Sequence, residues 1–567
     1  MRHFISPLLL LTLAAAPNAD AASTISPQAV ARLAEAGAPQ LALSLADGAQ
    51  PASSGERPLW LEWEGVRLDL LHRLDQSQEL LQRVDALPAD ASPELRQKAR
   101  WYAVRAAVES GAGEQARAGL ARLLWDAGLP PEEMREARRL VIQSYLAEHK
   151  ADEAYLAMLR YQQDYQPLEK AEIARFAQAL AANGKAAEAV PWLSRLDEGP
   201  LKLMIRLKAG LVGPEAAIGS ARAALQKSDG AVYWAVLAEA ASAQRDTTLQ
   251  VEAGERLLNE PDSPAREFTA VGAGQLWQSY FAHALAAGNR NQLLLGEDAA
   301  WLALAQREEA DSPPTARALF AYLAANGKES GLRGEAQTRL VASLLQQNMR
   351  VTANRLFAEG PLGKDHSGMV PEARTLLGRS ACRAGEYLLA ARLLRGAAAP
   401  TDVPAEEWQL TLAQVFAAAG AGQEALGAAQ QVLAQEGPLP DETAGKLLAV
   451  ARKLAAADQE NFAEQLLKAL DTPGDAALQR EIRFERGLLA EKRKDYPAAA
   501  AHFLLAASLG GGKDSAFEQS ARSFAAASLA RAGFAGDARA QYRQLLKAAS
   551  DPARQQEIRR ALDRLQP

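Results

Sequence analysis

Apolar residues recur along this chain three or four positions apart, and no stretch alternates apolar and polar positions over six residues. The first spacing places apolar side chains on one face of an α-helix, whereas strict alternation would indicate a strand. Alanine occurs throughout in pairs and triplets, as at 397–399. It has the highest helix propensity and lets helices approach closely. We therefore predict an all-α protein.

A pattern of small and large residues repeats in the C-terminal half. Gly378 and Gly487 are each followed nine positions later by a tyrosine, twelve later by an alanine and sixteen later by a large apolar residue. The alanine recurs at steps of 37, 35, 38, 36 and 39 residues, at Ala353, Ala390, Ala425, Ala463, Ala499 and Ala538. Nearer the start it recurs at steps of 38 and 35 residues, at Ala116, Ala154 and Ala189.

These spacings resemble those of the tetratricopeptide repeat, whose period is about 34 residues. In that family the small residue of a first helix lies against the alanine of a second, antiparallel helix. A larger side chain at either place would push the helix axes beyond the roughly 8–10 Å of close packing. The resemblance implies an α-solenoid, a superhelix of stacked antiparallel helix pairs with a groove lined by the first helices.

The pattern also divides the chain. We predict repeats of this type over 22–199 and 335–550, an irregular helical region at 200–334 and a capping helix at 551–567. The irregular region is expected to contain helices at 229–258, 266–287 and 291–308. The long connection at 359–371 is interpreted as a surface insertion, with a lid as the alternative.

The N-terminus has the order of residues found in export signals. Arg2 and His3 precede an apolar run at 7–16, and a small-x-small site ends at Ala21. No apolar segment reaches the roughly 18–20 residues that span a bilayer. The only cysteine is Cys382, so neither an internal disulfide nor a lipid anchor after the signal is expected. We predict a signal peptide at 1–21, cleavage after Ala21, and a soluble periplasmic protein.

The charge and the chemistry of the chain argue against several functions. The formal net charge is −6 and the sequence contains no basic cluster, so it gives no reason to expect binding of nucleic acid. No two histidines lie at helical metal-ligand spacing, and the adjacent residues of Asp365-His366-Ser367 cannot fold onto one another as a catalytic triad. We predict no enzyme activity, metal or cofactor.

One enzyme alternative is a peptidoglycan-cleaving transglycosylase, in which the catalytic glutamate is followed by serine. Glu109-Ser110 and Glu329-Ser330 have that order. Both lie at or near expected repeat turns, where little burial is available to raise the pKa of a glutamate. This alternative therefore ranks last.

Clustered aromatic residues offer another interpretation. Trp60 with Trp63, or Trp277 with Tyr280 and Phe281, could form a platform on which sugars stack. At helical spacing such residues more often pack between helices. The core interpretation is therefore favoured.

The family resemblance also implies groove positions, counted from the small residue of each first helix. They fall on Glu372, Arg379, Arg383, Glu407, Gln414, Arg452, Glu481, Glu491, Lys492 and Arg531. Guanidinium groups there would suit carboxylates of a partner. However, Arg379 and Arg452 stand where the carboxylate-clamp members of the family have asparagine, which speaks against recognition of chaperone tails.

We rank three functions on this basis. The first is a scaffold in a bacterial envelope that binds other envelope proteins or peptides. The second is a polysaccharide-binding accessory of an export system, and the third is the cell-wall hydrolase.

Overall fold

The computed structural model describes residues 26–565 except 53–55, 126–128, 228–229, 270, 289–290, 292–294, 435–438, 471–474 and 510–514. Over these residues the regular structure is helical and no strand occurs, which confirms the all-α prediction. Among them, no helix combines the length and the apolar character needed to cross a membrane. The predicted signal peptide at 1–21 lies outside the described residues.

The chain divides into two compact units, a first unit at 1–217 and a second unit at 218–567. The first unit contains α1 (Pro27–Glu35), α2 (Pro39–Ala49), α3 (Arg57–Arg73), α4 (Ser77–Asp85), α5 (Pro93–Glu109), α6 (Gly113–Trp125), α7 (Pro131–Ala147), α8 (Ala151–Asp164), α9 (Lys170–Ala182), the 3-10 helix η1 (Ala187–Arg195) and α10 (Pro200–Lys208). The division falls within α11 (Pro214–Leu225).

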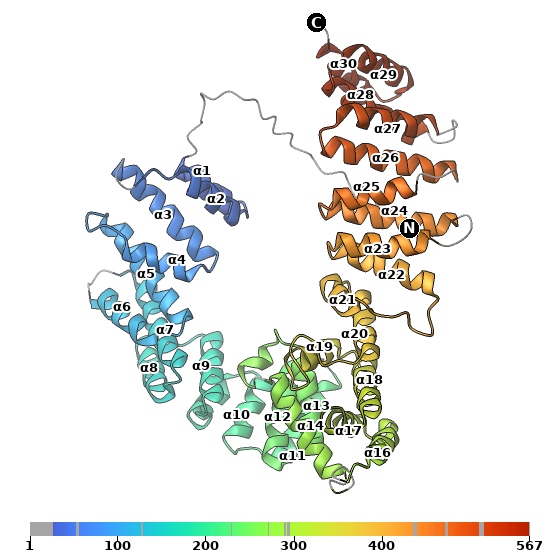
Figure 1. Ribbon diagram of the computed structural model, residues 1–567. Helices are drawn as coiled ribbons and strands as arrows, with labels where there is room; N and C mark the ends of the chain where they lie inside the picture. Colours follow the sequence, from blue (N-terminus) through green and yellow to red (C-terminus); the bar gives the residue numbers. More distant parts are fainter. Residues whose placement is uncertain are drawn as a thin grey trace. The chain divides into compact units, whose positions relative to one another are not determined.

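The second unit contains the remaining helices (Figure 1). They are α12 (Ala231–Gln244), α13 (Thr247–Asn259), η2 (Pro264–Glu267), α14 (Ala273–Ala287), α16 (Asp298–Asp311), α17 (Pro313–Asn326), α18 (Ser330–Gln346), α19 (Arg350–Glu359), α20 (Pro371–Arg383), α21 (Tyr387–Leu394), α22 (Ala405–Ala418), α23 (Gly422–Leu433), α24 (Asp441–Ala456), α25 (Glu460–Ala469), α26 (Ala476–Lys492), α27 (Tyr496–Ser508), α28 (Ser515–Arg531), α29 (Ala535–Ala548) and α30 (Pro552–Asp563).

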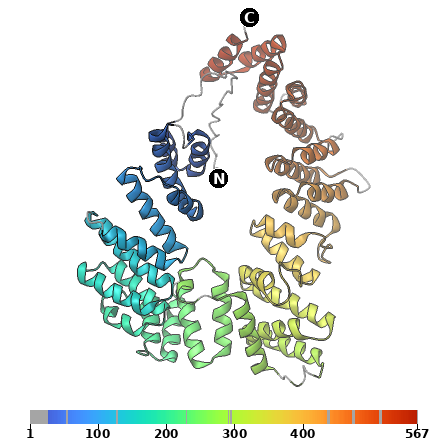
Figure 2. The same ribbon diagram turned by 60° about the vertical axis from the view of Figure 1, so that its left-hand side comes forward.

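Consecutive helices pack in antiparallel pairs, and each pair stacks on the next. In the first unit α5 packs on α6 and α7 on α8, while the first helices α5 and α7 also meet. In the second unit α22 packs on α23 and on the following first helix, α24. The succession from α20 to α30 is visible from two directions (Figure 1; Figure 2). This is the predicted α-solenoid architecture of tetratricopeptide-like helix pairs.

The alanines of the repeat lie where the pattern places them, in the second helix of a pair. All of them are fully buried: Ala116, Ala154, Ala189, Ala353, Ala390, Ala425, Ala463, Ala499 and Ala538. The small residue of the first helix lies against the second helix of the same pair. A Cβ atom added to Gly378 would lie 2.5 Å from Leu394 Cδ2, and one added to Gly487 would lie 2.6 Å from Phe503 Cε1. Small side chains are therefore required for the helices to pack this closely.

Gly487→Ala is expected to lower the free energy of unfolding by about 1–3 kcal/mol, because the new methyl group overpacks the contact with the buried ring of Phe503. Gly445→Ala is the matched control on α24, where an added Cβ has no heavy atom within 4 Å. That variant should gain up to about 1 kcal/mol from helix propensity. Urea unfolding followed by circular dichroism measures both. Equal effects of the two substitutions would contradict the packing role of Gly487.

One predicted repeat helix is not an α-helix. The helix that carries Ala189 is the 3-10 helix η1, with Pro191 inside it. Proline has no backbone N–H, and its ring clashes with the preceding turn of an α-helix. The segment still buries Ala189, Trp192 and Leu193 against its neighbours.

The irregular region differs from the prediction in three places. The predicted helix at 229–258 is two helices, because Arg245 between α12 and α13 has φ of 59° and the Asp246 side chain caps α13 by accepting from Leu249 N at 3.0 Å. The predicted helix at 266–287 begins only at Ala273, after η2. The helix predicted at 291–308 corresponds to α16, which runs over Asp298–Asp311, and residues 292–294 lie outside the described residues.

A buried ion pair joins three helices of the second unit. Arg317 on α17 donates from Nε to Glu255 Oε1 at 2.6 Å and from Nη2 to Glu255 Oε2 at 2.5 Å. The hydroxyl of Tyr280 on α14 donates to Glu255 Oε1 at 2.8 Å. Glu255 and Arg317 are only 1% and 3% exposed. Both oxygens of the buried carboxylate are thus bonded.

Candidate functional site

The predicted groove residues lie on the first helices of the second unit, from α20 to α28. Glu372, Arg383 and Glu407 are exposed, whereas Gln414 is half-buried. Arg379 makes an ion pair with Asp402, with 3.3 Å between Nη1 and Oδ2. Its charge is therefore balanced from within the chain.

Three further cations of the predicted groove pair with acidic residues of neighbouring helix pairs. Arg452 on α24 bonds to Glu481 at 3.0 Å and to Glu485 at 2.7 Å, both on α26. Lys492 Nζ lies 2.5 Å from Asp458 Oδ1 and 2.8 Å from Glu460 Oε1.

Arg531 on α28 pairs with Glu491 on α26. Together with the pairs of Arg452 and Lys492, this bond links successive helix pairs. The expected basic stripe is therefore largely neutralised by contacts between repeats. The assignment of these ten residues to partner binding stays a prediction.

The aromatic candidates separate into core and surface. Trp63, Trp277 and Tyr280 are at most 2% exposed, and Phe281 packs against the same core cluster as Trp277. Trp277 Nε1 donates to Leu356 O at 3.0 Å, so its polar edge is bonded as well. The core interpretation is confirmed for these residues. Trp60, by contrast, is half-buried and lines a hollow.

This hollow, called the Trp60 hollow below, lies along α3 and α4 and has a volume of about 820 Å³. Trp60 and Glu64, one turn apart on α3, form one side. The turn after α3 and the start of α4 supply Asp75, Gln76, Ser77, Gln78 and Glu79, and further along α4 come Gln82, Arg83 and Ala86. Apart from Trp60 and Ala86, the lining is polar.

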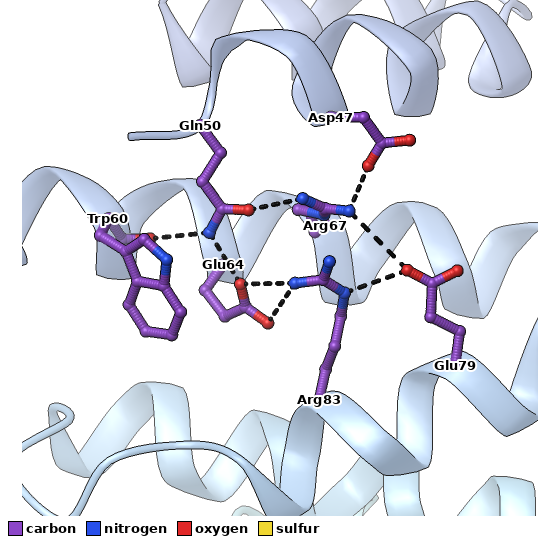
Figure 3. A network of polar contacts seen from close by, with 7 residues as sticks. All are labelled: Asp47, Gln50, Trp60, Glu64, Arg67, Glu79 and Arg83. Carbon is purple, nitrogen blue, oxygen red and sulfur yellow. Dashed lines mark hydrogen bonds and ion pairs between the residues drawn. The ribbon is translucent and has the colours of Figure 1, made fainter. Parts of the chain in front are cut away.

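A network of polar contacts forms the floor of the Trp60 hollow (Figure 3). Arg83 Nη1 donates to both oxygens of Glu64 at 3.0 Å, and Arg83 Nε donates to Glu79 Oε1 at 3.2 Å. Gln50 Nε2 donates to Glu64 Oε2 at 2.8 Å. Glu64 is only 1% exposed, so its carboxylate is held almost entirely by protein groups.

Arg67 extends the network behind this floor. Its Nη1 donates to Gln50 Oε1 at 2.6 Å, and its Nη2 pairs with Asp47 and lies 3.7 Å from Glu79 Oε1. Burial lowers the pKa of Arg83, but hydrogen bonds and charge attraction from Glu64 and Glu79 more than offset this, so its pKa lies above the usual value. The contacts of Arg67 and Arg83 thus tie α2, α3 and α4 together.

A second hollow, the Trp101 hollow, has a volume of about 500 Å³ and lies between α5 and α7, the first helices of successive pairs. It combines two aromatic rings with four carboxylates and two cations: Trp101, Tyr102, Glu94, Glu132, Glu133, Glu136, Lys98 and Arg105. Lys98 is bonded to Asp69 at 2.6 Å, and Arg105 lies 3.7 Å from Glu136. The indole Nε1 of Trp101 and Oε2 of Glu133 are buried atoms without a hydrogen-bond partner.

The enzyme candidates do not form a pocket. Glu109 and Glu329 are exposed at the ends of helices, as are the serines that follow them. His366 is buried, with Nε2 2.8 Å from Asn354 Oδ1, and burial lowers its pKa. Within the described residues, no cluster of three or more His, Cys, Asp or Glu could hold a metal ion.

The connection at 359–371 packs onto its neighbours. Gln337 on α18 donates to Gly368 O at 3.2 Å and accepts from Val370 N at 2.9 Å. Asp365 N donates to Ala358 O at 3.1 Å. These bonds agree with the surface-insertion interpretation.

Cys382 is half-buried beside the apolar core of the second unit. Burial raises the pKa of its thiol. The residue therefore fits the interpretation of a small apolar side chain.

Comparison with known proteins adds little to this picture. No family model and no curated protein matches the chain. Solved structures similar to it include the APC/C hetero-tetramer Cut9-Hcn1, at 13% identity over 88% of this chain and 99% of that chain, with a TM-score of 0.28. Another is the pentatricopeptide repeat protein PPR10 from maize, at 15% identity over 95% of this chain and 78% of that chain, with a TM-score of 0.29.

A third is Naa15/Naa10 bound to HypK-THB, at 12% identity over 94% of each chain, with a TM-score of 0.26. TM-scores this low carry no argument about function. The fold assignment rests on the helix pairs described above.

Proposed function

We propose that this chain is a non-catalytic scaffold of tetratricopeptide type that is exported to the periplasm and binds segments of other envelope proteins. The supporting observation is the Trp101 hollow, which lies between two successive first helices, the face that lines the groove in the resembled family. Aromatic rings supply contact area there, and the carboxylates supply hydrogen-bond acceptors.

The charges in the Trp101 hollow favour one kind of partner segment. Four carboxylates face two cations, of which Lys98 is already bonded to Asp69 outside the hollow. A lysine or arginine side chain of a partner could therefore lie over Trp101 and bond to Glu133, as cations commonly do with aromatic rings and carboxylates. An extended, basic peptide segment is the expected ligand.

Site-specific crosslinking in cells tests this proposal. A photo-crosslinking amino acid in place of Gln97, which lines the hollow on α5, is expected to capture a discrete partner protein. Glu133→Gln in the same chain should weaken that capture. The matched control carries the crosslinker in place of Arg122, exposed on the second helix α6. Equal capture from both positions, or none from either, would contradict a binding face on the first helices.

Three further outcomes would change the proposal. A first residue other than Ala22 in the mature protein would contradict the predicted cleavage site. Retention of the full-length chain in the cytoplasm would contradict the predicted export. A cell-wall zymogram tests the hydrolase alternative. If the protein cleared the gel and Glu109→Gln or Glu329→Gln abolished the clearing, the hydrolase function would be supported in place of the scaffold function.

A further inference from the structure

The Trp60 hollow is a preorganised depression that opens widely to solvent, with a volume of about 820 Å³. An open depression suits one part of an extended ligand better than a small molecule enclosed on all sides. The side chains of the floor are already held, since Glu64 is bonded to Arg83 and Gln50. A ligand therefore meets groups whose positions cost little further ordering.

The floor and rim of the hollow carry more negative than positive charge. The network contains three carboxylates, from Asp47, Glu64 and Glu79, and two guanidinium groups, from Arg67 and Arg83. Asp75 adds another carboxylate at the rim. No surplus of positive charge exists to attract an anionic ligand, so phosphate groups and uronic acids are disfavoured.

The uncharged part of the lining favours hydroxyl groups. Gln76, Gln78 and Gln82 each bring two N–H donors and a carbonyl acceptor. A hydroxyl group can donate and accept at once, so an array of hydroxyls matches such a surface. A basic peptide is a poorer match than in the Trp101 hollow, because Glu64 and Glu79 are already bonded to Arg83. Glu133 in the Trp101 hollow keeps one oxygen without a partner.

Trp60 supplies the remaining element. It is half-buried on α3, and its indole lies beside Glu64 at the edge of the network (Figure 3). The indole is a broad, flat apolar surface. A pyranose ring has one comparable face of C–H groups and carries its hydroxyls around the rim.

We propose that the Trp60 hollow binds a neutral oligosaccharide, with one pyranose ring stacked on Trp60 and its hydroxyl groups bonded to the accessible side chains of Gln78, Glu79 and Gln82. This site is independent of the peptide-binding face between α5 and α7. The choice of ligand rests on three features of the hollow: an aromatic ring, a floor without surplus positive charge, and walls rich in amide groups.

Isothermal titration calorimetry of the full chain with cello-oligosaccharides, malto-oligosaccharides and N-acetylated chito-oligosaccharides, all neutral, tests the assignment. The wild-type protein is expected to bind at least one of these series. Trp60→Ala should weaken that binding about tenfold or more, the equivalent of losing one stacked ring. Gln82→Ala, at an exposed lining position, should weaken it about threefold, as expected for one neutral hydrogen bond.

Trp125→Ala is the matched control. Trp125 is 87% exposed at the end of α6, outside the lining of the hollow, and its replacement should leave glycan affinity unchanged. Circular dichroism and the Tm of each variant establish that the fold is kept. Absence of binding to all three neutral series would overturn the proposal. Equal losses of glycan affinity in Trp60→Ala and Trp125→Ala would also overturn it. Tighter binding of oligouronates than of neutral glycans, or displacement of the bound sugar by basic peptides, would do the same.

Discussion

Replacing Arg317 by methionine is expected to lower the free energy of unfolding of the second unit by about 3–5 kcal/mol, because the Glu255 carboxylate would remain buried without its cation. Hydrogen exchange of α13, α14 and α17 measures the local loss, and urea unfolding measures the total. Tyr280 would still donate one hydrogen bond to Glu255. That bond cannot replace the two-point contact of the guanidinium group.

Two comparisons separate this effect from a general loss of charge. Arg339→Met removes an arginine whose pairs with Glu309 and Glu335 are partly exposed, and it should cost no more than about 1 kcal/mol. The double variant Glu255→Gln with Arg317→Met should recover part of the loss, since it leaves no buried charge. A loss in Arg339→Met as large as in Arg317→Met would contradict the interpretation.

The loss in free energy of unfolding caused by Arg317→Met, called the deficit below, should also depend on pH. Burial raises the pKa of Glu255, and Arg317 opposes that rise. Without Arg317 the folded-state pKa would lie further above the unfolded value of about 4.3. A raised pKa in the folded state favours folding below the unfolded pKa and loses that contribution as pH rises. The deficit relative to wild type is therefore expected to shrink between neutral pH and about pH 4.

Trp277→Ala is expected to cost about 3–5 kcal/mol, the usual range for removing a buried aromatic side chain. The indole contacts Phe357 on α19, with ring centroids 6.2 Å apart, and donates to Leu356 O on the same helix. An added Cβ at Gly360 would lie 2.3 Å from Trp277 Nε1, so the loop after α19 also closes on the ring. Urea unfolding measures the loss.

Trp277→Phe provides the graded comparison. It keeps an aromatic ring in the core but removes the N–H donor to Leu356 O, so a smaller loss of about 1–3 kcal/mol is expected. If Trp277→Ala left stability unchanged and reduced glycan binding instead, the residue would belong to a sugar platform and not to the core.

Much of the architecture could be predicted because its signal is local. The small side chains of Gly378 and Ala390 indicate a close contact between two helices. The recurrence of such residues along the chain gives the period of the helix pairs. The errors occurred where that signal stops. Arg245 interrupts an apolar helical pattern by adopting a left-handed backbone conformation. Arginine rarely adopts this conformation, so the sequence contains no signal for the break.

The candidate sites were only partly predictable. Aromatic residues at helical spacing identified Trp60 and Trp277 equally, and burial alone distinguishes them. Glu64 lies on α3 between two other charged residues, Glu62 and Arg67, so the local sequence does not mark it as the buried one. Its partner Arg83 is nineteen positions away and is not marked either. The cations expected to line the groove were found correctly as first-helix residues, but their pairing with Glu481, Glu485 and Glu491 was not foreseen.

By itself the sequence determined that this chain is helical, that its helices pair, and where the pairs repeat, because side-chain size and apolar spacing act between residues close along the chain. Only the tertiary structure decided which charges are neutralised and which tryptophan borders a hollow. Those properties depend on which side chains of the neighbouring helix lie opposite a given residue. The spacing of residues within one helix does not specify which side chains these are.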